Sequence, residues 1–90
     1  MGDRDALLYY RRATEFFEEA TEAHQAEDMP AAISAIKQGI HHLAIGLRLV
    51  TTQKGKQTLT ESLEFWTDTL AKLQAEEVGQ LPFVPQVSGE

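Results

Sequence analysis

The chain has 90 residues, enough for one small domain with one hydrophobic core and little surface to spare for a second site. It contains no cysteine, which excludes disulfides, thiolate catalysis and cysteine-based zinc sites, and we expect a cytoplasmic setting. The net charge of −6, with eight scattered basic residues, argues against nucleic acid and favours a basic or neutral partner.

Residues 4–26 are predicted to form the first helix, because small and apolar side chains recur there at helical spacing. One face carries Ala6, Tyr10, Ala13, Phe17, Ala20 and His24, and Tyr9, Phe16 and Ala23 flank it. The opposite face is acidic and carries Glu15, Glu18, Glu19 and Glu22. This acidic face either attracts a basic peptide or is an ordinary solvated surface that keeps a small protein soluble.

Residues 29–51 are predicted to form a second helix that returns antiparallel to the first after a short turn. Asp28 can cap this helix, and Pro30 falls in its first turn, where a missing N–H costs little. Its apolar stripe consists of Ile33, Ile36, Ile40, Leu43, Leu47 and Val50. Ala32, Gly39 and Gly46 border the stripe at seven-residue intervals, and small residues there allow a neighbouring backbone to approach. We therefore expect this helix to be the middle one of a bundle, contacted from both sides.

The polar segment Thr51–Gln57 reads as a loop, and a third helix is predicted over residues 59–78. Thr58 and Glu61 have the spacing of a capping box, and Gly79 is the expected C-terminal cap. The inward stripe of this helix consists of Leu59, Leu63, Trp66, Leu70 and Leu73.

The predicted fold is an all-α, antiparallel three-helix bundle over residues 1–79, followed by an extended tail over residues 80–90. The tail contains Pro82 and Pro85, and the residue before each proline is restricted to extended conformations.

No set of residues in the sequence has the spacing of an active site, so we expect no enzymatic activity, metal or cofactor. His41 and His42 are adjacent and point about 100° apart on a helix, unlike the same-face pair of a helical zinc site. His24 is expected to be a partly buried, hydrogen-bonded imidazole on the inward stripe of the first helix. No apolar run reaches the ~20 residues of a membrane span, and the first residues lack the features of a secretory signal.

Ile45 and Leu49 lie one turn apart on the second helix, away from its stripe, and Phe65 lies at the edge of the third helix beside Thr69 and Lys72. These apolar side chains line a binding groove, form the contact of a self-associating homodimer, or are ordinary isolated surface residues.

The segment EDMPAAISAIKQGI resembles the helix-turn-helix shared by tetratricopeptide repeats and by MIT (microtubule-interacting and trafficking) domains. Met29 and Ala32 match its apolar and small positions, and Ala20 stands where both patterns have a small residue in the first helix. The chain has no second copy at a period near 34 residues, so it is more similar to an MIT domain, and the similarity extends over residues 6–74. Trp66 falls where the family usually has Tyr.

The resemblance implies a non-enzymatic adaptor in protein transport, whose grooves receive short tails of ESCRT-type membrane-remodelling filament proteins and which associates with membranes only indirectly. It also allows a regulatory domain cut from a larger enzyme. In the family, the groove between helices 1 and 3 takes an extended, proline-containing peptide, which here implies Tyr9, Phe16, Phe17, Thr67 and Leu70. The groove between helices 2 and 3 takes a helical peptide, which implies Ile45, Leu49, Phe65, Asp68, Thr69 and Lys72. Ala71 stands where the family has the acidic residue that pairs with a ligand arginine.

The tail itself resembles the proline-containing ligand of that family, through Leu81, Pro82, Phe83, Val84 and Pro85. It is expected either to occupy the groove between helices 1 and 3, in the same chain or in a second copy, or to be a plain connecting segment.

Overall fold

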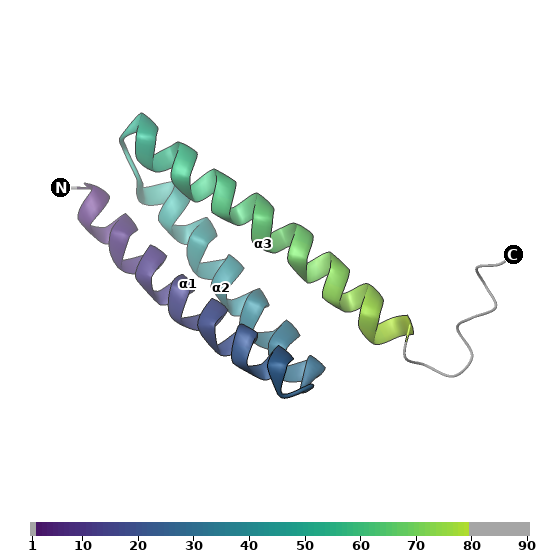
Figure 1. Cartoon of the computed structure of the whole chain (residues 1–90). Coiled ribbons are helices and arrows are strands. Elements are labelled where there is room, and N and C mark those ends of the chain that lie inside the picture. The colour runs from purple at the N-terminus through teal and green to yellow at the C-terminus, as the bar shows by residue number, and fades with distance from the viewer. Residues whose placement is uncertain (1, 80–90) are drawn as a thin grey trace, which may run out of the picture.

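The computed structural model describes residues 2–79, with side chains for residues 4–76. These residues form three helices and no strand: α1 (Gly2–Gln25), α2 (Met29–Leu49) and α3 (Gln53–Gly79) (Figure 1). The prediction of an all-α three-helix bundle is confirmed. The extended tail predicted over residues 80–90 lies outside the described residues.

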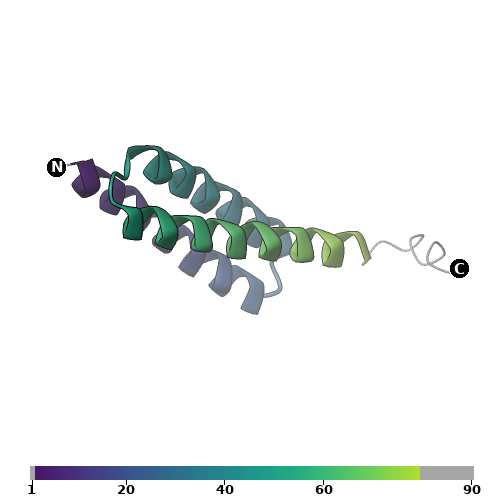
Figure 2. The same ribbon diagram turned by 90° about the horizontal axis from the view of Figure 1, so that it is seen from above.

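Helix α2 is the middle helix, and both α1 and α3 pack against it (Figure 1). The α1–α2 interface is the more extensive one, and α1 and α3 make few direct contacts with each other. The start of α1 and the connection from α2 to α3 lie at the same end of the bundle, so α1 and α3 run in the same direction. Figure 2 shows that α3 continues beyond the α1–α2 hairpin at the opposite end.

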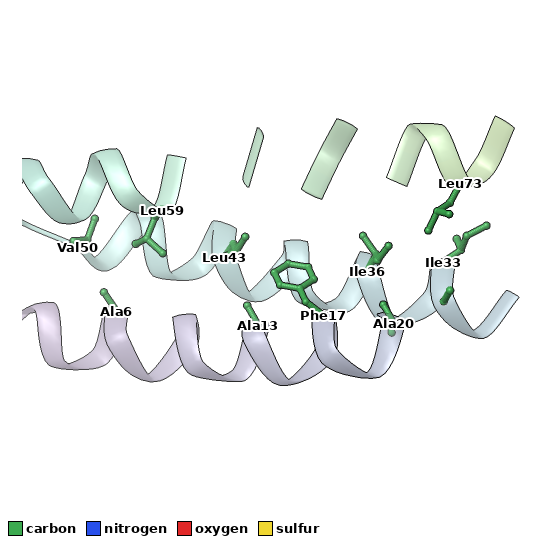
Figure 3. Close-up of a cluster of buried hydrophobic side chains, with 12 residues drawn as sticks. Ala6, Ala13, Phe17, Ala20, Ile33, Ile36, Leu43, Val50, Leu59 and Leu73 are labelled. Carbon is green, nitrogen blue, oxygen red and sulfur yellow. The ribbon is translucent and has the colours of Figure 1, made fainter. Parts of the chain in front are cut away.

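The core is one row of apolar side chains along the interfaces of α2 (Figure 3). It consists of Ala6, Ala13, Phe17, Ala20, Ala32, Ile33, Ala35, Ile36, Leu43, Val50, Leu59 and Leu73. Ile36 and Leu43 are the largest fully buried side chains, and Ile40 and Leu47 of the predicted stripe pack against the core while remaining partly exposed. The small residues of α1 and α2 bring these two helices close together, which accounts for their more extensive contact.

Gly39 lies directly against the Phe17 ring of α1. A Cβ atom at this position would lie 2.8 Å from both Cδ1 and Cζ of Phe17, and closer still to Cε1. Gly46 is less crowded, since a Cβ there would lie 3.3 Å from the Ala6 carbonyl oxygen and 3.4 Å from the Tyr9 Cβ. The absence of a side chain at Gly39 therefore creates the space that the Phe17 ring occupies.

The turn between α1 and α2 is closed by capping interactions on both sides. The N–H of Glu27 donates to the His24 carbonyl (3.0 Å) and the N–H of Asp28 donates to the Ala23 carbonyl (2.8 Å), which is the hydrogen-bond pattern of a Schellman motif. Glu27 has a φ of 63°, in the left-handed region where glycine is usual. The predicted N-cap is present, because an Asp28 carboxylate oxygen accepts from the N–H of Ala31 at 3.3 Å.

The predicted loop Thr51–Gln57 and the Thr58 capping box are wrong, because α3 begins at Gln53. Thr52 is the residue that caps this helix, through a hydrogen bond of 3.1 Å from the N–H of Gly55 to its hydroxyl oxygen. Thr58 therefore lies inside α3, and Glu61 accepts a hydrogen bond from the Gln57 side chain at 3.2 Å. A threonine cap needs only a backbone N–H three residues later, and Gly55 supplies it as well as any other residue.

Candidate peptide-binding groove

A groove runs between α1 and α3, with α2 contributing to its floor. It forms because both outer helices pack against α2 and not closely against each other. Three depressions follow one another along it, of about 390, 260 and 210 Å³. Tyr10 lines both the first and the second depression, and Thr21 and Trp66 line both the second and the third. The three depressions are therefore parts of one continuous surface feature, which we call the α1–α3 groove.

The first depression lies at the end of the bundle where α1 and α3 begin. It is lined by Ala6, Leu7, Tyr10, Val50, Thr52, Lys54, Gly55, Thr58 and Leu59. Leu7 is 49% exposed although it is a large apolar side chain, and Lys54 is the one charged residue of this lining. This end of the groove thus offers an apolar surface with a cation at its rim.

Phe17 and Trp66 form the floor at the centre of the groove. Their rings are stacked with centroids 4.1 Å apart and an angle of 4° between the planes. Phe17 is buried against α2 beside Gly39, so the stacked pair connects all three helices. The second depression lies over this pair and is lined by Tyr10, Thr14, Phe17, Glu18, Thr21, Ser62 and Trp66.

The third depression lies toward the end of α1. It is lined by Ala20, Thr21, His24, Ile36, Phe65, Trp66, Thr69 and Leu73. Phe65 is 61% exposed, the highest value among the large apolar side chains of the described residues, and its ring packs edge-on against Trp66 with centroids 5.1 Å apart. Nothing in the described residues covers this phenyl ring, so it is available to a ligand.

The threonines of the groove walls use their hydroxyl hydrogens within their own helices. Thr14 donates to the Tyr10 carbonyl, Thr21 to the Phe17 carbonyl and Thr69 to the Phe65 carbonyl, at 3.0, 3.0 and 2.9 Å. Because these three donors are already satisfied, Thr14, Thr21 and Thr69 offer a ligand their hydroxyl oxygens only as acceptors.

The His24 imidazole is about half-buried, as predicted, and its contact across the helices is with a carboxylate. Its Nε2 atom lies 3.6 Å from Oε1 of Glu76 on α3, and both side chains are about half exposed. This contact joins α1 and α3 at the end of the groove, where α2 is only beginning and no third helix covers the ring.

The residues predicted for the groove between helices 1 and 3 lie on more than one face. Phe17 is in the floor, but Tyr9 and Phe16 lie on the other side of α1, where their ring centroids are 5.9 and 5.2 Å from that of His42 on α2. Thr67 is exposed and Leu70 packs against the core, and neither lines a depression. Of these five residues only Phe17 lines the α1–α3 groove, and a role of the other four in peptide binding stays a prediction.

The residues predicted for the groove between helices 2 and 3 also lie on different faces of the bundle. Phe65 and Thr69 line the α1–α3 groove. Leu49 follows His42 by seven residues and hence lies on the α1-facing edge of α2, with Ile45 beside it. Asp68 and Lys72 form an exposed ion pair on α3, at 3.2 Å. These residues do not form one groove, and Ile45, Leu49 and Phe65 do not form one face for a homodimer.

Of the residues predicted for a groove, only Phe17, Phe65 and Thr69 line a depression, so most of the lining was not predicted as a binding site. No role at all was predicted from the sequence for Leu7, Thr14, Thr21 and Ser62. Thr14 and Thr21 carry a usable signal, because they are seven residues apart and each follows an inward residue, Tyr10 or Phe17, by four. The sequence contains no sign of which edge of the first helix faces the third.

His41 and His42 line none of the three depressions. His41 and His42 lie edge-to-face with centroids 5.7 Å apart, and His42 Nδ1 is 2.8 Å from the Gln38 carbonyl oxygen. Within residues 2–79 no group of three or more His, Cys, Asp or Glu side chains is placed to hold a metal ion. None of the three helices is both long and apolar enough to cross a membrane, as far as the chain is described.

Comparisons with protein-family models, with curated proteins and with solved structures return no match. The resemblance to MIT domains therefore stays a prediction from the sequence.

Proposed function

We propose that this chain is a protein-interaction module, without enzymatic activity of its own, that binds short linear peptides in the α1–α3 groove. The observation that carries this proposal is the continuous groove with two mainly apolar ends, where Leu7 and Phe65 are exposed, and a more polar middle. Exposed large apolar side chains that border a groove are typical of binding surfaces. An extended peptide could place alternate side chains into the depressions.

The resemblance to MIT domains supports a ligand class. In that family the groove between the first and third helices receives extended, proline-containing tails of ESCRT-type filament proteins. We propose such tails as the partners, which makes the chain a cytoplasmic adaptor in protein transport that reaches membranes through its partner. A groove of this size gives a weak, transient complex, because the area it can bury is below that of stable interfaces.

The experiment is a shift-perturbation titration of the isotope-labelled chain with two synthetic peptides, one proline-containing and one helical, from ESCRT-type tails. We expect the proline-containing peptide to shift Thr21, Trp66 and Thr69. Phe65→Asp should lower the affinity at least about five-fold, because it replaces an apolar contact by a charge. The matched control is Leu49→Asp, which changes an exposed leucine outside the groove and should leave binding unchanged.

The opposite pattern would overturn this proposal. Shifts centred on Leu49 and Ile45, with loss of binding in Leu49→Asp and not in Phe65→Asp, would move the site to the α1–α2 face. No shift with either peptide would reject peptide binding of this class.

We further propose that the chain's own segment Leu81–Pro85, which lies outside the described residues, can occupy the same groove in the same chain or in a second copy. Its apolar and proline residues are of the kind the resemblance implies for a ligand. The test compares the full-length chain with Phe83→Asp, and with Gln86→Asp as the control for added charge. If the segment occupies the groove, Phe83→Asp shifts the resonances of Thr21 and Trp66 and strengthens binding of an external peptide. Identical positions of the Thr21 and Trp66 resonances in both variants and the parent chain would reject self-occupation.

A further inference from the structure

Charged residues are arranged in a fixed order along the α1–α3 groove. Lys54 lines the first depression and Glu18 the second, and the His24–Glu76 pair lies at the third. Lys54 and Glu18 are exposed, and neither forms an ion pair with another described residue. The groove therefore has a cation near the beginning of α1 and α3 and an unpaired anion at its middle.

The start of α3 adds to the positive charge near Lys54. Lys54 and Gly55 belong to the first turn of α3, where the backbone N–H groups point toward the helix start and carry partial positive charge. The third depression has no unpaired cation among its described lining residues, because its one basic group, His24, already faces Glu76. The two ends thus differ in the charge that they offer to a ligand.

The spacing of the depressions sets the length of a matching peptide. Along α3, Leu59 lines the first depression, and Thr69 and Leu73 line the third. A rise of about 1.5 Å per helical residue separates these positions by roughly 15–21 Å. An extended peptide advances about 3.3 Å per residue and its side chains alternate between two faces, so side chains roughly six residues apart reach both depressions from the same face. The second depression and Glu18 then lie near the middle of that span.

Resting on the proposed function, we infer that the groove selects extended peptides of one charge pattern. Two apolar side chains about six residues apart fill the first and third depressions. A basic residue between them faces Glu18, and an acidic residue beyond the first apolar side chain faces Lys54. The charges determine that the acidic end of the peptide lies over Lys54. This acidic end can be either the N-terminal or the C-terminal end of the peptide, because the pattern is defined by side chains. The chain's own residues 80–90 contain one acidic residue and no basic one, so a partner of the full pattern displaces this segment.

Each charge contact is expected to change affinity by about two- to five-fold, because ion pairs between exposed groups are weak. The preference should shrink as salt is raised, since the charges are exposed to solvent.

The experiment uses three synthetic peptides, and each is synthesised twice, once with the residues in the stated order from N- to C-terminus and once in the opposite order. The pattern peptide carries Glu, then Leu, then Lys, then Phe, with Leu and Phe six residues apart and Ser at the other positions. The neutral peptide has Gln in place of Glu and Lys, and the reversed peptide exchanges Glu and Lys. Affinities are measured by shift-perturbation titration of the full-length chain at low salt.

We expect the pattern peptide to bind most tightly and the reversed peptide least. The double variant Glu18→Lys with Lys54→Glu keeps the net charge and should invert this order. Glu19→Lys with Lys37→Glu is the matched control, because it exchanges two exposed charges that line no depression, and it should leave the order unchanged.

The outcomes separate this inference from the proposed function. Equal binding of the three peptides at groove resonances would overturn the charge pattern and leave peptide binding standing. An order that Glu18→Lys with Lys54→Glu does not invert would also overturn it, because the charges would then act through the overall field of the protein. No groove shift with any of these peptides would overturn the pattern, whereas the proposed function is rejected only if the proline-containing tail peptide also fails to shift the groove.

Discussion

Gly39→Ala should destabilise the bundle, because the Phe17 ring of α1 lies directly against this residue. The new Cβ would lie 2.8 Å from Cδ1 and Cζ of Phe17 and closer to Cε1, whereas carbon atoms in good contact lie about 3.5–4.0 Å apart. The Phe17 ring would have to move by roughly 1 Å to restore that contact distance. It cannot do so freely, since it is buried and stacked on Trp66.

The expected magnitude combines two opposing effects. Forcing an extra methyl group into a packed core costs about 1–3 kcal/mol, and replacing glycine by alanine inside a helix returns about 1 kcal/mol. The contact at Phe17 is severe, so we expect a net loss of about 1–2 kcal/mol. For a domain of this size that corresponds to a fall in Tm of about 4–16 °C.

The assay is thermal and urea unfolding followed by far-UV circular dichroism, with Gly46→Ala as the matched control. A Cβ at Gly46 would meet its nearest atom at 3.3 Å, so the helix-propensity gain should make this variant neutral or up to about 1 kcal/mol more stable. The reasoning would be refuted if Gly39→Ala were as stable as the parent chain, or if both variants changed stability equally.

Three further predictions concern stability, all measured by the same unfolding assay. Thr52→Ala removes the cap of α3 and should cost about 0.5–2 kcal/mol, whereas Thr58→Ala, inside the helix, should stay within about 0.5 kcal/mol of the parent; the reverse order would restore the predicted capping box. Leu43→Ala should cost about 2–5 kcal/mol because Leu43 is fully buried, and Leu49→Ala, at 39% exposure, less than about 1 kcal/mol; similar losses would contradict the core as described. Glu27→Gly should be neutral or stabilise by up to about 1 kcal/mol, because glycine adopts the positive φ without strain but is more flexible when unfolded; a clear loss of stability would contradict the Schellman turn.

The sequence determined the number of helices, their inward stripes and the cap at Asp28. These features depend on local spacing and on hydrogen bonds between residues a few positions apart, which a sequence displays directly. It also indicated that the second helix would be approached closely at Gly39 and Gly46. It misplaced the start of α3, because Thr52 and Thr58 are both able to cap a helix and only the fold around them decides which one does.

The sides of the helices that face each other were decided by the tertiary structure. Phe17 belongs to the predicted inward face of α1 and Phe16 flanks it, and the Phe16 ring meets His42 on α2 whereas the Phe17 ring meets Trp66 on α3. Phe65 and Thr69 could equally have faced either partner helix, and the packing of α3 on α2 turned them toward α1. Helical periodicity specifies the angle of a side chain around its own axis, but the direction in which a neighbouring helix lies depends on how three helices fill one core. The α1–α3 groove therefore became visible only in the folded chain.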